Sequence, residues 1–384
     1  MLTSDRVLGI DATNLRQGGG RTHLAELLRA AIPETHGFSR VVVWGSQATL
    51  ALLDDRHWLV KENPPAQEGA LWSRTLWQRF HLAKAARKTG CNVLFVPGGS
   101  YASDFHPFVA MSQNLLPFEW QELRRYGWSL MTLKMLLLQR VQSRTFRLAD
   151  GVIFLTHYAK ACVEHITGEL LNNTIIPHGL NERFVLAPRK QKSIKAYSID
   201  QPFRILYVSI IDQYKHQWHV VEAVDKLRQT TGWQVTLDLV GPSYPPALCR
   251  LNVGIQKHDP EKNWVHYYGA VPFDQLHGIY QQADLGLFAS SCENMPNILL
   301  ETMASGLPVV SSNRGPMPEM LGDAGIYFDP EVPQDIATAL QKMISSEILR
   351  TTLSSASYAA SKQYTWDRCA LETFDFIAKV AREH

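Results

Sequence analysis

The chain has 384 residues, of which 45% are hydrophobic and only 19% are Asp, Glu, Lys or Arg. At roughly 150 residues per domain, this length predicts two or three domains, and the apolar content excludes a disordered chain. The net charge is +2, but 22 Lys and Arg stand against 15 Asp and Glu in residues 1–190, and 16 stand against 21 in residues 191–384. This asymmetry fits a basic surface for an anionic partner, and it equally fits an uneven solvated surface.

The cysteines and the apolar runs bear on the compartment. Five scattered cysteines without a C-x-x-C pair predict neither a disulfide framework nor a zinc site. The N-terminal residues lack the features of a signal peptide. The longest apolar stretch, residues 130–138, is interrupted by Thr132 and Lys134 and is far shorter than the roughly 20 residues of a membrane span. We therefore expect a cytoplasmic protein.

Short apolar or β-branched runs alternate with longer helix-like segments along the whole chain. In the first half the predicted strands begin at Val7, Val41, Asn92, Phe108, Gly151 and Thr174. In the second half they begin at Arg204, Val235, Val265, Asp284, Leu307 and Gly325. This alternation predicts two α/β domains, each with a doubly wound parallel sheet and crossover helices.

Residues 186–203 separate the two series of strands. They contain four basic residues and two prolines and show no apolar period, which is typical of a linker. We therefore predict a first domain over residues 1–186, a linker over 187–203 and a second domain over 204–363. Open α/β sheets bind ligands at the carboxyl ends of their strands, so the active site is expected between the halves.

The segment 291–312, SCENMPNILLETMASGLPVVSS, predicts a loop, a helix and a strand. Pro296 suits the first helical turn, and Gly306 suits the left-handed position that ends the helix. Glu293 precedes this helix and Glu301 lies within it. A helix N-terminus that faces a cleft favours anions because its N–H groups are unpaired.

Glu293 and Glu301 form an E-x7-E pair that is followed by MASGLPVVSS and NRGPMPE, and this string resembles the signature of family 4 retaining glycosyltransferases. The resemblance implies the GT-B fold, in which two Rossmann-like domains face each other across a cleft. It also implies that the second domain holds a nucleotide sugar and the first domain holds the acceptor. Glu301 would bind the ribose hydroxyls, and Glu293 would contact the donor sugar as a catalytic residue.

Other parts of the chain carry the same resemblance. The stretch from Gly9 is similar to the family's first strand, glycine-rich loop and helix. Its Gly18, Gly19 and Gly20 permit close approach to a phosphate or an acceptor. The sequence YTW from Tyr364 looks like the start of the family's last helix, so residues 364–384 are expected to pack back on the first domain.

The chain departs from the family pattern in the second domain. Where the family usually has G-R-x4-K, this chain has Ser209, Ile210 and Lys215. Lys215 is predicted to be catalytic because a cation offsets the charge of the departing diphosphate. It would act alone or with Arg314, Lys262 or a residue of the basic half. The other residues implied for the donor site are Ser209, Met295, Asn297, Ile298 and Arg314, with the N–H groups of Met295 and Asn297 replacing the one that Pro296 lacks.

The first domain also departs from the pattern. Gln113 and Asn114 stand where the family often has His-Asp, and an amide can hydrogen-bond a sugar but cannot take up a proton. A same-face mechanism needs no protein base, because the departing phosphate oxygen can accept the proton. The sequence has no D-x-D pair and no H-x-x-x-H cluster, so no metal and no other cofactor is expected.

Residues 72–87 and 119–147 alternate cations with Trp, Phe and Leu, and residues 67–147 hold 11 basic and 4 acidic residues. A basic amphipathic face fits peripheral binding to the anionic inner face of the cell membrane. The alternative is a core helix with a solvated edge. Nucleic acid is not expected, since no nucleic-acid motif accompanies the charge.

Together these features predict a retaining hexosyltransferase. It would move a hexose from a GDP- or UDP-sugar to a surface polysaccharide, a lipopolysaccharide or a lipid-linked oligosaccharide. A nucleotide-sugar epimerase of the same fold is the nearest alternative. A NAD-dependent dehydrogenase shares the paired Rossmann pattern, but no G-x-G-x-x-G follows the first strand. Ile210 and Gln113 also leave a non-catalytic nucleotide-sugar-binding protein open.

Overall fold

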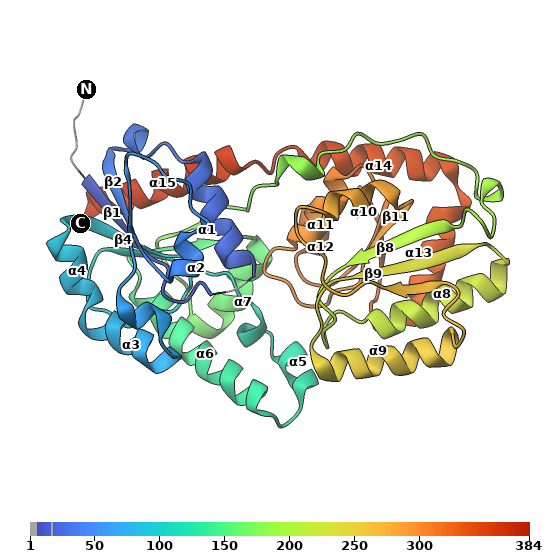
Figure 1. The fold of residues 1–384 in the computed structure, drawn as a ribbon, viewed down its shortest axis with the longest axis horizontal. Coiled ribbons are helices and arrows are strands. Elements are labelled where there is room, and N and C mark those ends of the chain that lie inside the picture. Colours follow the sequence, from blue (N-terminus) through green and yellow to red (C-terminus); the bar gives the residue numbers. More distant parts are fainter. Residues whose placement is uncertain (1–5, 17) are drawn as a thin grey trace. The chain divides into compact units, whose positions relative to one another are not determined.

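The computed structural model describes residues 6–16 and 18–384, which form two compact units. The first unit comprises the described residues up to Leu123, Gly127–Gly179 and Tyr364–His384. The second comprises Arg124–Tyr126 and Leu180–Gln363. Each unit holds one parallel sheet with helices on its faces (Figure 1). The predicted fold class, two Rossmann-like α/β sheets, is confirmed.

The first unit has a seven-stranded sheet in the order β3-β2-β1-β4-β5-β6-β7. Its strands are β1 (Arg6–Asp11), β2 (Phe38–Trp44), β3 (Leu59–Glu62), β4 (Cys91–Val96), β5 (Phe108–Met111), β6 (Gly151–Phe154) and β7 (Asn173–Ile175). All six predicted strands of this half are present. The edge strand β3 has no counterpart among them, because its short sequence LVKE lacks an apolar run.

The helices of the first unit cover this sheet. They are α1 (Gly19–Ala30), α2 (Gln47–Leu50), α3 (Leu71–Phe80), α4 (Leu82–Lys88), α5 (Trp120–Leu123), α6 (Leu130–Leu148), α7 (His157–Thr167) and α15 (Trp366–Glu383). The last helix, α15, packs into the core, where the ring of Phe374 lies 6.3 Å from that of Phe38. A Cβ atom on Gly151 would lie 2.9 Å from Phe376 and from Val380, so α15 contacts β6 closely.

The second unit has a six-stranded sheet in the order β10-β9-β8-β11-β12-β13. Its strands are β8 (Phe203–Val208), β9 (Val235–Val240), β10 (Val265–Tyr267), β11 (Leu285–Phe288), β12 (Val309–Ser312) and β13 (Ile326–Phe328). Its helices are α8 (Gln217–Thr231), α9 (Pro245–His258), α10 (Leu276–Gln282), α11 (Asn297–Ala304), α12 (Met317–Leu321), α13 (Pro333–Ser345) and α14 (Glu347–Ser361). In Figure 1, α8 and α9 lie on one face of the sheet and α10, α11 and α14 on the other. All six strands match the predicted runs.

The segment 187–203, which the sequence predicts to be a linker, packs against the second unit. Arg350 on α14 is fully buried and donates hydrogen bonds to Oε1 of Gln191, at 3.3 Å, and to the carbonyl of Lys192. Just before this segment, the N–H of Leu186 donates to the carbonyl of Ala304 at 2.9 Å. The buried guanidinium therefore holds this polar stretch together with Ile194 and Tyr197, which pack against the core of the second unit.

Both sheets have a topological switch point, where the chain leaves one side of the first strand and continues on its other side. In the first unit this point lies between β1 and β4, and in the second it lies between β8 and β11. The carboxyl ends of neighbouring parallel strands meet there, and ligands of open α/β sheets bind in that crevice. The two switch points are therefore where site residues are expected.

Candidate functional site

Lys215 and Glu293 meet at the switch point of the second unit. Lys215 follows β8 and Glu293 follows β11, and the Lys215 ammonium donates a hydrogen bond to Oε1 of Glu293. The two side chains are only 6% and 16% exposed. Lys215 Nζ also lies 5.1 Å from the ring centroid of Tyr214 and 5.2 Å from that of Phe288. The two predicted catalytic residues thus form an ion pair that is largely shielded from solvent.

Glu301 lies on α11, the helix that follows the loop containing Glu293. The helix begins one residue later than expected, because Pro296 precedes it, while Gly306 takes the expected left-handed conformation with φ of 63°. Burial raises the pKa of Glu301 to about 8, and the hydroxyl of Tyr280, which donates to it at 3.3 Å, opposes that rise. A carboxyl group with this pKa is mostly protonated at neutral pH.

The loop before α11 already uses one of the predicted N–H donors. The N–H of Asn297 donates to the carbonyl of Met295 at 3.0 Å, so it would have to exchange that partner to bind a donor sugar. Met295 is buried and Ile298 is half-buried beside Glu301. Oδ1 of Asn297 is buried and accepts no hydrogen bond within the described residues. The side-chain amide of Asn297 is therefore a better candidate for a ligand contact than the backbone N–H of the same residue.

The cation that the family pattern places at position 210 is absent, and its suggested substitutes lie in different places. Ile210 is 37% exposed. Arg314 is exposed and forms an ion pair with Asp329 at 2.6 Å. Lys262 lies between α9 and β10, which puts it at the amino ends of the strands, away from the switch point. The structure therefore does not bring Lys262 to the site.

A short segment from the first half of the sequence adds charge near Lys215. Residues Arg124–Tyr126 belong to the second unit. Arg125 binds both carboxylate oxygens of Glu331, at 3.0 and 2.6 Å, and the hydroxyl of Tyr126 donates to Asp212 at 2.7 Å. Asp212 is in turn linked to the site, because its carbonyl accepts the N–H of Lys215 at 3.1 Å. No local sequence signal predicts this, since the partners are 206 and 86 residues apart.

Glu331 lies near positive groups. Its pKa lies below the usual range, chiefly because of the hydrogen bond from Arg125, and the charge of Arg314 lowers it further. His216 precedes α8, directly follows Lys215 and contacts Oγ of Ser291 at 2.9 Å. Arg125 and Arg314 are thus the cations that the fold holds around one carboxylate beside the Lys215 loop.

The predicted phosphate or acceptor loop occupies the switch point of the first unit. Gly18 has φ of 69°, and Gly19 and Gly20 begin α1. A Cβ atom on Gly20 would lie 2.8 Å from Oε1 of Gln113, so the structure brings this loop and Gln113 together. Gly20, Gln113 and Asn114 all line one pocket of this unit, which has a volume of about 540 Å³.

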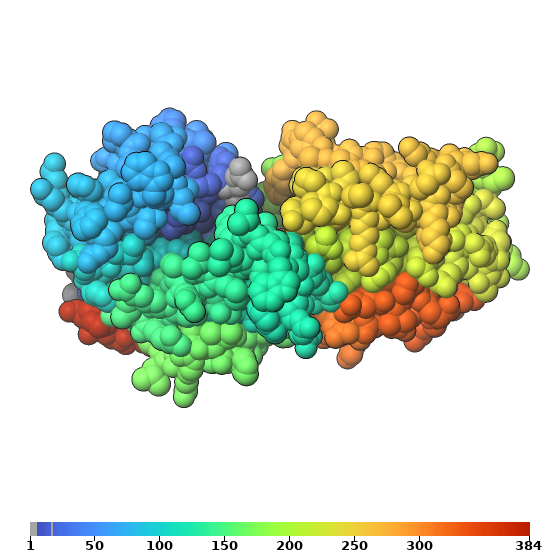
Figure 2. All heavy atoms as spheres, turned by 90° about the horizontal axis from the view of Figure 1, so that it is seen from below, coloured from blue at the N-terminus to red at the C-terminus, as the bar shows by residue number. Residues whose placement is uncertain are grey.

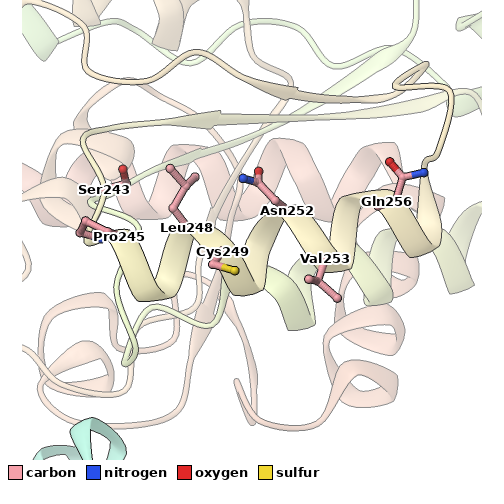
Figure 3. Close-up of a pocket in the computed structure, with 7 residues that line it drawn as sticks. All are labelled: Ser243, Pro245, Leu248, Cys249, Asn252, Val253 and Gln256. Atoms are coloured by element: carbon pink, nitrogen blue, oxygen red, sulfur yellow. The ribbon is translucent and has the colours of Figure 1, made fainter. Parts of the chain in front are cut away.

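A second pocket, of about 580 Å³, runs along one exposed face of α9 (Figure 3). It is lined by Ser243, Pro245, Leu248, Cys249, Asn252, Val253 and Gln256. None of these is a predicted site residue, and none carries a permanent charge that would bind a phosphate. This pocket therefore does not add to the candidate site.

Within residues 6–16 and 18–384, no group of three or more His, Cys, Asp or Glu could hold a metal ion. Among the described helices, none combines the length and apolar character that crossing a bilayer requires.

Two parallel Rossmann-like units in one chain match the architecture of the GT-B class of folds. Residues 202–346, which lie in the second unit, match the family model described as "Glycosyl transferases group 1". In overall structure the chain is similar to sucrose-phosphate synthase from Thermosynechococcus elongatus, with a TM-score of 0.73 and 17% identity over 96% of this chain and 97% of that one.

Two relatives found by sequence are named as mannosyltransferases. The chain is 31% identical over 114 residues to O-antigen chain mannosyltransferase B of Escherichia coli, which is 30% of each chain. It is 23% identical over 267 residues to a GDP-mannose-dependent alpha-(1-6)-phosphatidylinositol monomannoside mannosyltransferase of Mycobacterium tuberculosis. That match covers 65% of this chain and 66% of the relative, so both matches span less than two thirds of the relatives' length.

Proposed function

We propose that the chain is a retaining glycosyltransferase of family 4 that moves a hexosyl group from a nucleotide sugar to a saccharide acceptor. The observation that carries the proposal is the Lys215–Glu293 pair at the β8/β11 switch point, with Glu301 eight residues beyond Glu293 on α11. GDP-mannose is the first donor to test, because both named relatives are mannosyltransferases and one is named as GDP-mannose-dependent.

In the proposed reaction the bond between the anomeric carbon and the diphosphate oxygen breaks as the acceptor hydroxyl attacks from the same face. The departing phosphate oxygen takes the hydroxyl proton, so no protein base is required. Lys215 stabilises the charge that develops on the diphosphate, and Arg125 and Arg314 reinforce the field in place of the missing cation at Ile210. Glu293 contacts the donor sugar, Glu301 accepts hydrogen bonds from the ribose, and Gln113 and Asn114 orient the acceptor.

A non-catalytic nucleotide-sugar-binding protein is the second candidate. It is favoured by Ile210 and by the engagement of Arg314 with Asp329 and of Arg125 with Glu331. Such a protein would bind GDP or UDP through Glu301 without releasing nucleoside diphosphate from a sugar donor. Turnover therefore separates the two candidates, while an epimerase would yield a nucleotide sugar of changed configuration and no transfer product.

The acceptor is proposed to be presented at an anionic membrane surface. One face of α6 exposes Leu130, Leu133 and Leu137, and the cations Arg140 and Arg144 are exposed on the same helix. Figure 2 shows a face of the molecule on which the side chains of this part of the chain, in teal, lie at the surface. An apolar ridge beside exposed cations fits a bilayer interface with anionic lipid. Arg125 does not contribute, because it pairs with Glu331.

The test uses the full chain with GDP-mannose and with a panel of UDP-sugars. We expect release of nucleoside diphosphate from one donor. Once an acceptor is supplied, we expect transfer of the sugar from that donor, and NMR of the product should show that the α configuration is retained. Glu293→Gln should abolish release, whereas Glu222→Gln, on the exposed side of α8, should not. Absence of release from every donor, together with no thermal stabilisation by GDP or UDP, would exclude the proposed function.

A further inference from the structure

The pocket at the switch point of the first unit has the composition of an anion site. Its lining comes from the segments that follow β1, β4 and β5, together with α3 and α6. These three strands are neighbours in the sheet, so their carboxyl ends meet at this place. The lining holds three cations, Arg16, Arg74 and Lys134, and no Asp or Glu among the described residues that form it.

The two arginines are held by neutral groups. Arg16 donates to the carbonyl of Gln67 at 2.5 Å, and Arg74 donates to the carbonyl of Thr13 at 3.0 Å. These contacts fix the guanidinium groups at the pocket without neutralising them. Each guanidinium has further N–H groups in a rigid planar arrangement that matches phosphate oxygens.

The charges of Arg16 and Arg74 also repel each other. Burial lowers the pKa of Arg74, and the charge of Arg16 lowers it further. The charge of Arg16 helps to lower the pKa of Glu68. That carboxylate, however, already accepts hydrogen bonds from the N–H of Gln47 and the side chain of Asn63, at 2.7 and 2.8 Å. An anion bound in the pocket would relieve the repulsion and accept charge-assisted hydrogen bonds from both arginines.

Two polar atoms of the lining lack hydrogen-bond partners within the described residues. They are Nε of Arg74, which is a donor, and Oε1 of Gln142, which is an acceptor on a side chain that is only 3% exposed. Buried polar atoms are normally satisfied, by protein, water or a ligand. A phosphate oxygen suits the first atom and a sugar hydroxyl suits the second.

We propose that this pocket binds a phosphate or diphosphate group of the acceptor, with Arg16, Arg74 and Lys134 as its cations and Gln142 as the partner of a neighbouring sugar hydroxyl. The assignment to the acceptor rests on the proposed transferase function, whereas the anion site itself does not. A soluble sugar phosphate and a polyprenyl diphosphate both carry the required group, and the experiment separates them.

The first test locates the anion by residue. The full chain is treated with phenylglyoxal, with and without inorganic pyrophosphate, and the modification rate of each arginine is measured by mass spectrometry. We expect pyrophosphate to slow modification of Arg16 and Arg74 several-fold and to leave Arg79 unchanged, since Arg79 is exposed on the same helix outside the pocket. Equal rates with and without pyrophosphate at all three arginines would overturn the proposal.

The second test measures affinity in the Lys215→Ala background, which weakens anion binding in the second unit. Arg74→Gln should raise the Kd for pyrophosphate about tenfold, the effect of losing one charge-assisted hydrogen bond. Arg79→Gln is the matched control. If Arg74→Gln fails to fold by circular dichroism, the exposed Lys134→Gln replaces it. An unchanged Kd in the folded variant would contradict the site.

The third test identifies the source of the phosphate. One arm uses a methyl mannoside 6-phosphate in solution, and the other uses neutral phosphatidylcholine vesicles that contain a polyprenyl diphosphate. If Arg74→Gln weakens binding in either arm, that result supports the proposal and assigns the acceptor class. If Arg74→Gln binds as tightly as the wild type in both arms, the proposal is overturned. If GDP and UDP fail to bind while pyrophosphate protects Arg74, the transferase function fails and the anion site stands.

Discussion

The ammonium of Lys215 is hydrogen-bonded to the carboxylate of Glu293 in a setting where both side chains are largely shielded from water. The two residues are 78 positions apart, and they meet because β8 and β11 are adjacent strands at the switch point. Each residue therefore serves as the counterion of the other until a diphosphate arrives. In the proposed reaction a donor phosphate would compete with Glu293 for Lys215.

This pair predicts a coupled effect on stability. Lys215→Met and Glu293→Gln should each lower the free energy of unfolding by about 3 kcal/mol, because each leaves a shielded charge without its partner, and the double variant should lose less than the sum. Urea unfolding measures the three values. The partly exposed pair Lys226 and Glu222 on α8, at 3.6 Å, is the control and should couple by less than about 0.5 kcal/mol. Additive losses at Lys215 and Glu293 would contradict the pairing.

Glu301 predicts a pH dependence. Its folded-state pKa of about 8 lies above the ordinary value of 4.5, so the folded chain holds a proton that the unfolded chain releases. Stability from this group should therefore fall as pH rises from about 5 to about 8, by at most about 1.4 kcal/mol per pH unit. Glu301→Gln should flatten that part of the profile of melting temperature against pH. A profile identical to wild type would show that Glu301 is ionised in the folded chain.

Ligand binding gives a second readout for the same carboxyl group. Ribose hydroxyls that donate to Glu301 favour its ionised form, so binding of GDP or UDP below about pH 8 should release a proton. Calorimetry in two buffers of different ionisation enthalpy measures that proton. Glu301→Ala should remove the release and weaken binding by roughly 1.5–3 kcal/mol, the loss of charge-assisted hydrogen bonds. Unchanged affinity would place the nucleoside elsewhere.

Arg125 predicts a kinetic effect. If it supplies positive potential that Ile210 cannot, Arg125→Gln should lower kcat by about tenfold or more and change KM less, because the charge on the leaving group is greatest in the transition state. Its neighbour Arg124 is exposed, and Arg124→Gln should behave as wild type. Equal kinetics for the two variants would leave Lys215 and Arg314 as the cations of the site.

The exposed face of α6 predicts binding to anionic vesicles. Co-sedimentation should rise with the fraction of anionic lipid and fall with salt, since each cation near the surface contributes about 1 kcal/mol. Replacing Arg140 and Arg144 by Gln should weaken binding, whereas replacing Lys257 and Lys262, which carry the same charge change in the second unit, should not. Equal recovery with neutral and anionic vesicles would argue for a soluble acceptor.

Local sequence patterns account for most of the fold. The twelve predicted strands are present because most of them are apolar runs that are buried in a parallel sheet. Gly306 ends α11 as predicted because few other residues adopt its φ of 63°. The strand β3 escapes prediction because it lies at the sheet edge, where Lys61 and Glu62 are tolerated.

Local sequence patterns predict fewer of the residues in the candidate sites. Lys215, Glu293 and Glu301 stand in a motif, but Arg125 reaches Glu331 only through the fold, across 206 residues. Arg16, which follows β1, and Arg74, which lies on α3, likewise come together at one pocket only through the fold, and neither lies in a recognisable motif. Asn297 shows the opposite case, since its N–H is a plausible donor in the sequence and is already used by Met295 in the structure.

The placement of α15 has a consequence for biosynthesis. Apart from Arg124–Tyr126, the chain enters the second unit at Leu180 and returns to the first at Tyr364. Helix α15 then supplies the buried Phe374 and Val380 to the core of the first unit. During translation at 5–20 residues per second, the first sheet would therefore wait roughly 10–40 seconds for its last covering helix while the second unit is made. A premature stop codon between Leu180 and Gln363 would thus expose the core of the first unit as well as truncate the second.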